Sequence, residues 1–115
     1  MKNKNAWLKE FDVAVTVCDR DGVLLEMNDK AIKTFAKDGG AKLIGTNMMA
    51  CHHGESKEKV KKLLEAGEKN VYTIEKEGVK KLIYQAPWYK DGEYAGFVEM
   101  SLVIPFEMPH FIRKP

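Results

Sequence analysis

Cysteine is scarce in this sequence, and its two cysteines, Cys18 and Cys51, exclude two classes of small protein. Two cysteines cannot form the disulfide framework that stabilises many small secreted domains. They also supply too few thiolates to hold an iron–sulfur cluster by themselves. We therefore expect two reduced thiols in a cytoplasmic protein.

Long hydrophobic runs are also lacking. No apolar stretch approaches the roughly 20 residues that a membrane-spanning helix requires. The first five residues are polar, and the apolar segment of a signal peptide does not follow them. The sequence therefore predicts no membrane association and a cytoplasmic location.

Neither sign of charge dominates, because 19 Lys and Arg are balanced by 17 Asp and Glu, which leaves a formal net charge of +2. So small an excess gives no electrostatic argument for nucleic acid as a partner. Hydrophobic residues make up 44% of the 115 residues and charged residues 31%. This mixture is typical of one soluble globular domain and not of a disordered chain.

Alternation of side-chain character predicts strands toward both ends of the chain. Residues 11–19 alternate and are rich in β-branched side chains, which is typical of a strand. An Asp-Gly pair at 21–22 then predicts a hairpin turn into a second strand at 23–27. The same alternation predicts three more strands, at 71–77, 81–89 and 94–104.

The helical signals all fall between the two groups of strands. Asn28 can cap a first helix, and short irregular helical turns are expected over 46–53. Ser56 is the expected N-cap of a longer helix that Gly67 ends. We therefore expect an α+β fold in which a five-stranded antiparallel sheet has helices inserted between strands two and three, covering one face.

The other face of that sheet needs its own cover, which the N-terminal residues or a second subunit would supply. The expected organisation is an N-terminal cap at 1–10, a single domain at 11–104 and an extended C-terminal tail at 105–115. The tail carries prolines at 109 and 115, which disfavour a helix there.

This order of elements resembles a PAS domain. The resemblance rests on the opening hairpin that ends at Asn28, the first helix over 28–35, a Leu-Ile-Gly element at 43–45 and the final hairpin at 91–101. Four such pieces in the right order and spacing are more specific than any one of them. The resemblance runs from Phe11 to Ile104.

The resemblance implies a sensory or regulatory module and not an enzyme. Members of the family bind a small ligand or cofactor between the helices and the inner face of the sheet, or mediate dimerisation. The residues outside 11–104 are too few for an output domain. We therefore expect a stand-alone module that binds a small molecule and signals as a homodimer or through a separate partner protein.

Methionine and aromatic residues supply the candidates for an adaptable pocket lining. Ordinary core packing is the other reading of the same residues, because methionine readily fills irregular gaps. The ligand-pocket residues expected from the sequence are Phe35, Met48, Met49, Tyr84, Trp88 and Met100.

Cys51, His52 and His53 form the one dense cluster of metal-ligand side chains in the sequence. One reading is structural, with one histidine at the start of the following helix and the other solvated. The functional reading is an axial haem ligand or a transition-metal site joined by His110. A haem- or metal-dependent redox or gas sensor is therefore the alternative function, and a nucleophile–base pair of Cys51 and His53 is a third, enzymatic one.

The cofactor is left open, with haem a candidate, whereas flavin adduct chemistry is disfavoured. The light-sensing branch of the family carries Gly-x-Asn-Cys-Arg-Phe-Leu-Gln. Residues 45–52 of this chain read Gly-Thr-Asn-Met-Met-Ala-Cys-His, so Met48 stands where the photoreactive cysteine would be. A thioether cannot form the cysteinyl–flavin bond.

Overall fold

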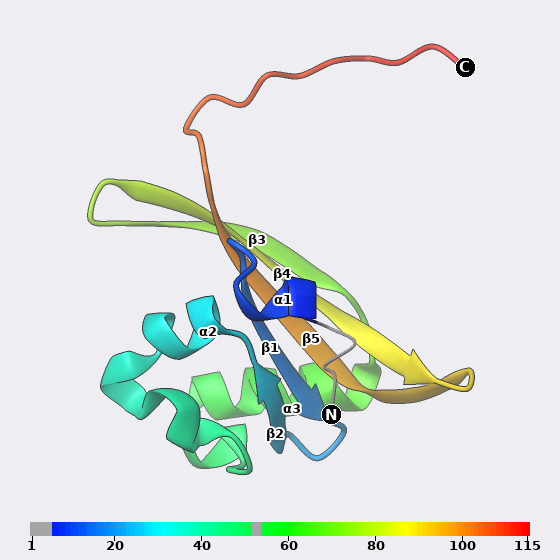
Figure 1. Ribbon diagram of the computed structural model, residues 1–115. Coiled ribbons are helices and arrows are strands. Elements are labelled where there is room, and N and C mark those ends of the chain that lie inside the picture. The colour runs from blue at the N-terminus through cyan, green and yellow to red at the C-terminus, as the bar shows by residue number, and fades with distance from the viewer. Residues whose placement is uncertain (1–5, 52–53) are drawn as a thin grey trace.

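The computed structural model describes residues 6–51 and 54–115, and it consists of one antiparallel sheet with helices against one of its faces (Figure 1). The strands lie in the order β2-β1-β5-β4-β3. They are β1 (Ala14–Asp19), β2 (Leu24–Met27), β3 (Asn70–Lys76), β4 (Val79–Lys90) and β5 (Glu93–Ile104).

The helices fall mainly between β2 and β3, as the sequence predicts. They are α2 (Asp29–Thr34), the 3-10 turns η1 (Ala36–Asp38), η2 (Gly40–Leu43) and η3 (Met48–Cys51), and α3 (Glu55–Ala66). A single short helix, α1 (Ala6–Lys9), precedes the sheet. The predicted fold class, a five-stranded antiparallel sheet with helices inserted between its second and third strands, is confirmed. Within the described residues, no helix is long and apolar enough to cross a membrane.

Asn28 connects three separate parts of the chain. Its Oδ1 accepts hydrogen bonds from the backbone N–H groups of Val15 (2.9 Å) and Ala31 (3.1 Å), so it caps α2 as predicted. Its Nδ2 donates to the carbonyl oxygens of Leu8 (3.1 Å) and Val13 (2.7 Å). One buried amide therefore joins the N-terminal segment, β1 and α2.

The limits of the long helix agree with the prediction at one end only. Gly67 ends α3 with a left-handed conformation (φ 65°) and donates its N–H to the carbonyl of Leu63. At the other end the prediction that Ser56 is the N-cap is wrong, because α3 begins at Glu55 after Gly54. Gly54 has φ 57°, a conformation that glycine adopts without the cost a side chain would add.

The register of the strands decides which side chains face the helices. Thr16 pairs with Glu99, which pairs with Gln85, and this row lies on the inner, helix-covered face. Cys18 and Phe97 form the next row on that face, where Leu64 of α3 packs against them. Because successive residues of a strand point to opposite faces, the outer face carries the alternate residues of each strand.

The C-terminal tail leaves the sheet after Ile104 and runs away from it without helix or strand (Figure 1). Every residue from 105 to 115 is exposed. Several of the exposed residues are large and apolar, namely Phe106, Met108, Phe111 and Ile112.

Candidate functional site

Two adjoining cavities lie between the helices and the inner face of the sheet. The smaller has a volume of about 110 Å³, and the larger about 540 Å³. Thr16, Met48 and Glu99 line both cavities, so the two spaces meet at these residues. This meeting point lies against the central strand of the sheet, because Glu99 is on β5.

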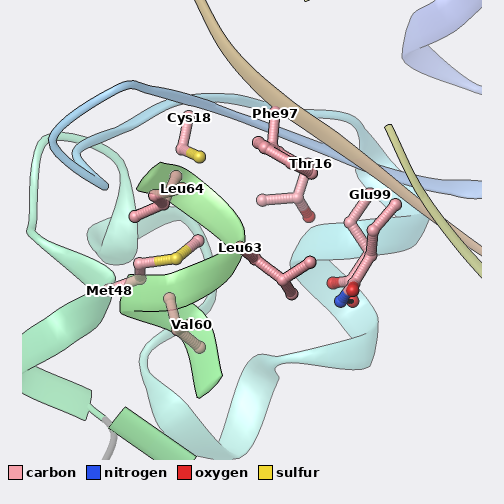
Figure 2. Close-up of a pocket in the computed structure, with 9 residues that line it drawn as sticks. Thr16, Cys18, Met48, Val60, Leu63, Leu64, Phe97 and Glu99 are labelled. Atoms are coloured by element: carbon pink, nitrogen blue, oxygen red, sulfur yellow. Dashed lines mark hydrogen bonds between the residues drawn. The ribbon is translucent and has the colours of Figure 1, made fainter. Parts of the chain in front are cut away.

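The smaller cavity is largely apolar, with one polar side. Figure 2 shows Cys18, Leu64 and Met48 gathered at one end and Glu99 at the other. Leu63 of α3 points into the space between them. Helix α3 can supply this wall because its apolar residues recur at helical spacing and so share one face of the helix.

The polar side of the cavity is a hydrogen-bonded row that crosses the sheet. Gln85 Nε2 donates to Glu99 Oε1 at 2.8 Å, and Asn70 Nδ2 donates to Gln85 Oε1 at 2.9 Å. These residues stand opposite one another on β3, β4 and β5, and Thr16 of β1 completes the row beside Glu99. The row is held in place by strand pairing and needs no loop.

Burial and the nearby carboxylate alter the acidity of two groups near the cavities. Burial raises the pKa of the Cys18 thiol, whose residue is only 2% exposed, so this wall of the smaller cavity is uncharged at neutral pH. Burial, and secondarily the negative charge of Glu99, raises the pKa of Tyr72, which lines the larger cavity. Tyr72 therefore keeps its hydroxyl proton there as a potential donor.

The expected pocket residues divide between the two faces of the sheet. Phe35 and Met48 line the cavities, and Met49 packs against the core cluster formed by Cys18, Leu24, Leu64 and Phe97. That these residues bind a ligand stays a proposal.

Tyr84, Trp88 and Met100 were expected in the lining too, but they line neither cavity. Tyr84 pairs with Met100, a row that alternates with the inner Gln85–Glu99 row and so lies on the outer face. Trp88 instead donates its Nε1–H to the carbonyl oxygen of Cys18 at 2.9 Å. These residues do alternate between the two faces of the sheet, but the more apolar face lies away from the helices.

Sequence reasoning missed the polar row. Gln85 and Glu99 occupy alternate positions in strands that were predicted, but a charged or amide side chain in a strand normally indicates the solvent face. One signal could have located Gln85 and Glu99. In both strands the positions that alternate with them are strongly apolar, and if those positions form the outer face, the polar positions must form the inner one.

The potential metal ligands fall largely outside what the structure describes. His52 and His53 lie outside the described residues, and His110 is exposed in the C-terminal tail. No group of three metal-ligating side chains occurs among the residues that the structure describes. No described histidine lines either cavity.

No family model matches this sequence, and no curated protein matches it. Known structures do resemble it. A C-terminal domain from Streptococcus mutans matches with a TM-score of 0.70 and 24% identity, over 86% of this chain and 81% of that one.

Two similar structures are named as PAS proteins. The PAS domain of Bordetella pertussis BvgS matches with a TM-score of 0.62 and 16% identity, over 86% of this chain and 82% of its own. The Aer2 receptor of Vibrio cholerae, described as a dual PAS–haem oxygen sensor, matches with a TM-score of 0.61 and 15% identity, over 81% and 95%. The sheet order, the inserted helices and these matches together show that the chain has the PAS fold.

Proposed function

We propose that this chain is a sensory module that binds a small molecule between its helices and the inner face of its sheet. The observation that carries the proposal is the pair of cavities that meet at Thr16, Met48 and Glu99. The larger cavity, at about 540 Å³, falls within the roughly 300–1,000 Å³ of typical ligand sites. Apolar walls with a few converging polar groups are also typical of such sites.

The two walls of the site belong to different parts of the fold, which suits a sensor. One wall is the sheet and the other is formed by α3, η2 and the start of η3, through Leu63, Leu43 and Met48. A ligand that touches both walls favours the conformations in which the two are packed closely, and so shifts the populations of the protein. Signal output then follows through a homodimer or a separate partner protein.

The proposal is tested by blocking the smaller cavity. We expect Leu63→Trp to fill this space and to remove any small molecule that copurifies with the wild-type protein. Native mass spectrometry of freshly purified protein measures the bound mass. Lys62→Trp is the matched control, because Lys62 is exposed on the same helix and should keep the ligand.

Two results would contradict the proposal. One is equal retention of a copurified molecule by Leu63→Trp and Lys62→Trp, since a ligand that spans the meeting point of the two cavities would lose its place in the smaller one. The other is a wild-type protein that carries no bound molecule and shows no rise in melting temperature with any compound of a broad metabolite library.

Haem is the second candidate, and one observation favours it: a similar structure is described as a PAS–haem oxygen sensor. In this chain the axial ligand would come from Cys51, His52 or His53. Visible absorption after reconstitution with haemin tests the idea, because a ligated haem has a sharp Soret band. His52→Ala and His53→Ala should each be measured, and a spectrum identical to that of free haemin in all three proteins would contradict it.

We further propose that the protein acts in the cytoplasm, without enzymatic activity and as a homodimer. The outer face of the sheet supports the last point, because it exposes apolar residues such as Val71 (46%) and Met100 (37%). Trp7 at the N-terminus is also exposed, at 64%. Exposed apolar surface of this kind commonly marks a protein–protein contact.

A further inference from the structure

Glu99 is an unusual residue for its position. It lies on β5, the middle strand of the five, and its side chain lines both cavities on the helix-covered face. Glu99 is only partly buried, but in this lining its carboxylate gives up some of its contact with water, which hydrogen bonds or a positive charge can replace. The groups around Glu99 therefore indicate which kind of ligand its carboxylate would accept.

Hydrogen bonding compensates Glu99 only in part. Its Oε1 accepts from Gln85 Nε2, and Gln85 is itself oriented by Asn70. Gln85 is a neutral donor, so the charge of the carboxylate is not balanced by it. The carboxylate is thus held in a fixed orientation by the sheet and presented to the cavities.

No cation of the described residues forms an ion pair with Glu99. The ion pairs there are Lys9–Asp29 and Lys30–Asp12, and all four residues are on the surface. The lysines that line the larger cavity, Lys76 and Lys81, belong to its other end. Lys81 is four residues from Gln85 along β4, which corresponds to roughly 14 Å.

The rest of the lining agrees with a cationic guest beside Glu99. Thr16 stands next to it on β1 and offers a hydroxyl oxygen as a second acceptor. Asp38 lines the larger cavity together with Lys76 and Lys81, so the charge preference is expected at Glu99 itself. Phe97 and Leu63 provide apolar surface close to these acceptors.

We propose that the ligand of this site carries a protonated nitrogen, as an amine, amidine or guanidine group, and that Glu99 is the residue that selects it. This inference rests on the proposed function of the cavities. The nitrogen donates a charge-assisted hydrogen bond to the Glu99 carboxylate. The apolar body of the ligand fills the space against Phe97, Leu63 and Met48.

Three probes of nearly the same shape test the charge preference directly. Benzamidine is a cation, benzamide is neutral and benzoate is an anion at pH 7. We expect benzamidine to bind the wild-type chain most tightly and benzoate least, as measured by isothermal titration calorimetry and by the rise in melting temperature. Added salt should weaken benzamidine binding and leave benzamide binding nearly unchanged.

Glu99→Gln identifies the selecting residue. The substituted amide can still accept the hydrogen bond from Gln85, so the row across the sheet is retained while the charge is lost. We expect at least about a tenfold loss of benzamidine affinity and little change for benzamide. Glu75→Gln is the matched control, since it makes the same change at an exposed position on β3 and should bind benzamidine like the wild type.

The possible outcomes distinguish the role of Glu99 from the more general claim that the cavities bind a ligand. Preference for benzoate, or equal benzamidine binding by Glu99→Gln and wild type, contradicts the role of Glu99 but leaves the cavity as a ligand site. Failure of all three probes to bind at millimolar concentration contradicts the inferred ligand class, while the copurification test with Leu63→Trp decides the proposed function separately. If Glu99→Gln does not fold by circular dichroism, Glu99→Asp, which withdraws the carboxylate by one methylene, is expected to lower benzamidine affinity in the same sense.

Discussion

At the scale of single residues, Asn28 shows how one side chain can hold a small domain together. It is 6% exposed and uses both ends of its amide, toward β1 and α2 as acceptor and toward the N-terminal segment as donor. Few other residues can do this, because aspartate has no donor and serine has too short a reach.

Asn28→Ala is expected to lower the free energy of unfolding by about 3 kcal/mol, because four backbone groups, two of them buried and two partly buried, lose a partner. Urea denaturation followed by circular dichroism measures the change. Thr34→Ala is the control: it also removes a side-chain hydrogen bond, to the carbonyl of Lys30, but an exposed one, and should cost no more than about 0.5 kcal/mol. Equal costs for the two variants would contradict the role given to Asn28.

At the scale of elements, Gly96 explains how two non-adjacent strands are connected across a third. Gly96 of β5 lies between Asp19 of β1 and Trp88 of β4 in the register of the sheet. The indole of Trp88 donates to the carbonyl oxygen of Cys18 on β1, so it must pass over β5 at this point. A glycine leaves that path open.

Gly96→Ala is expected to lower the free energy of unfolding by about 3 kcal/mol or more. Its Cβ would collide with the carbonyl oxygen of Cys18 and lie 2.8 Å from the Cα of Asp19, and the backbone has φ 151°. Gly92→Ala controls for positive φ alone, since it has φ 82° with open space around it, and should cost about 1 kcal/mol. Thermal unfolding compares the pair, and a smaller loss for Gly96→Ala would count against this account.

The same elements show what alternation along a sequence can and cannot predict. The strands, their hairpins and the inserted helices could be predicted from the sequence, because each of these elements depends on a pattern that spans only a few residues. The identity of the inner face did not follow, because it depends on which side the helices cover. The set Val98, Met100 and Leu102 is more apolar than Phe97, Glu99 and Ser101, and yet the second set faces the cavities.

Helix limits were predictable where a single residue decides them. Gly67 has to adopt a left-handed conformation, and glycine signals this locally. Ser56 is a favourable N-cap residue by type, but the chain turns at Gly54 and the helix begins at Glu55, before the serine. The start of α3 depends on how the preceding chain turns at Gly54, and the local pattern around Ser56 does not show that turn.

At the scale of the whole molecule, the apolar outer face predicts self-association. We expect the wild-type protein to form a dimer at micromolar concentration and Met100→Glu to be monomeric, because a charge on the outer face would be buried without a partner. Light scattering coupled to size-exclusion chromatography measures the mass. Val103→Glu is the control, as Val103 is exposed on the same strand but points to the inner side. A wild-type protein that stays monomeric up to high micromolar concentration would contradict the prediction.

The hydrogen-bonded row across the sheet also provides an internal spectroscopic reporter. The side-chain amide protons of Gln85 resonate apart from the backbone, and one of them is donated to Glu99. Any molecule that engages this carboxylate changes the strength of that bond and shifts the proton resonance. Nuclear magnetic resonance of the unmodified protein can therefore follow occupancy of the site at a single known side chain, without a label on the ligand.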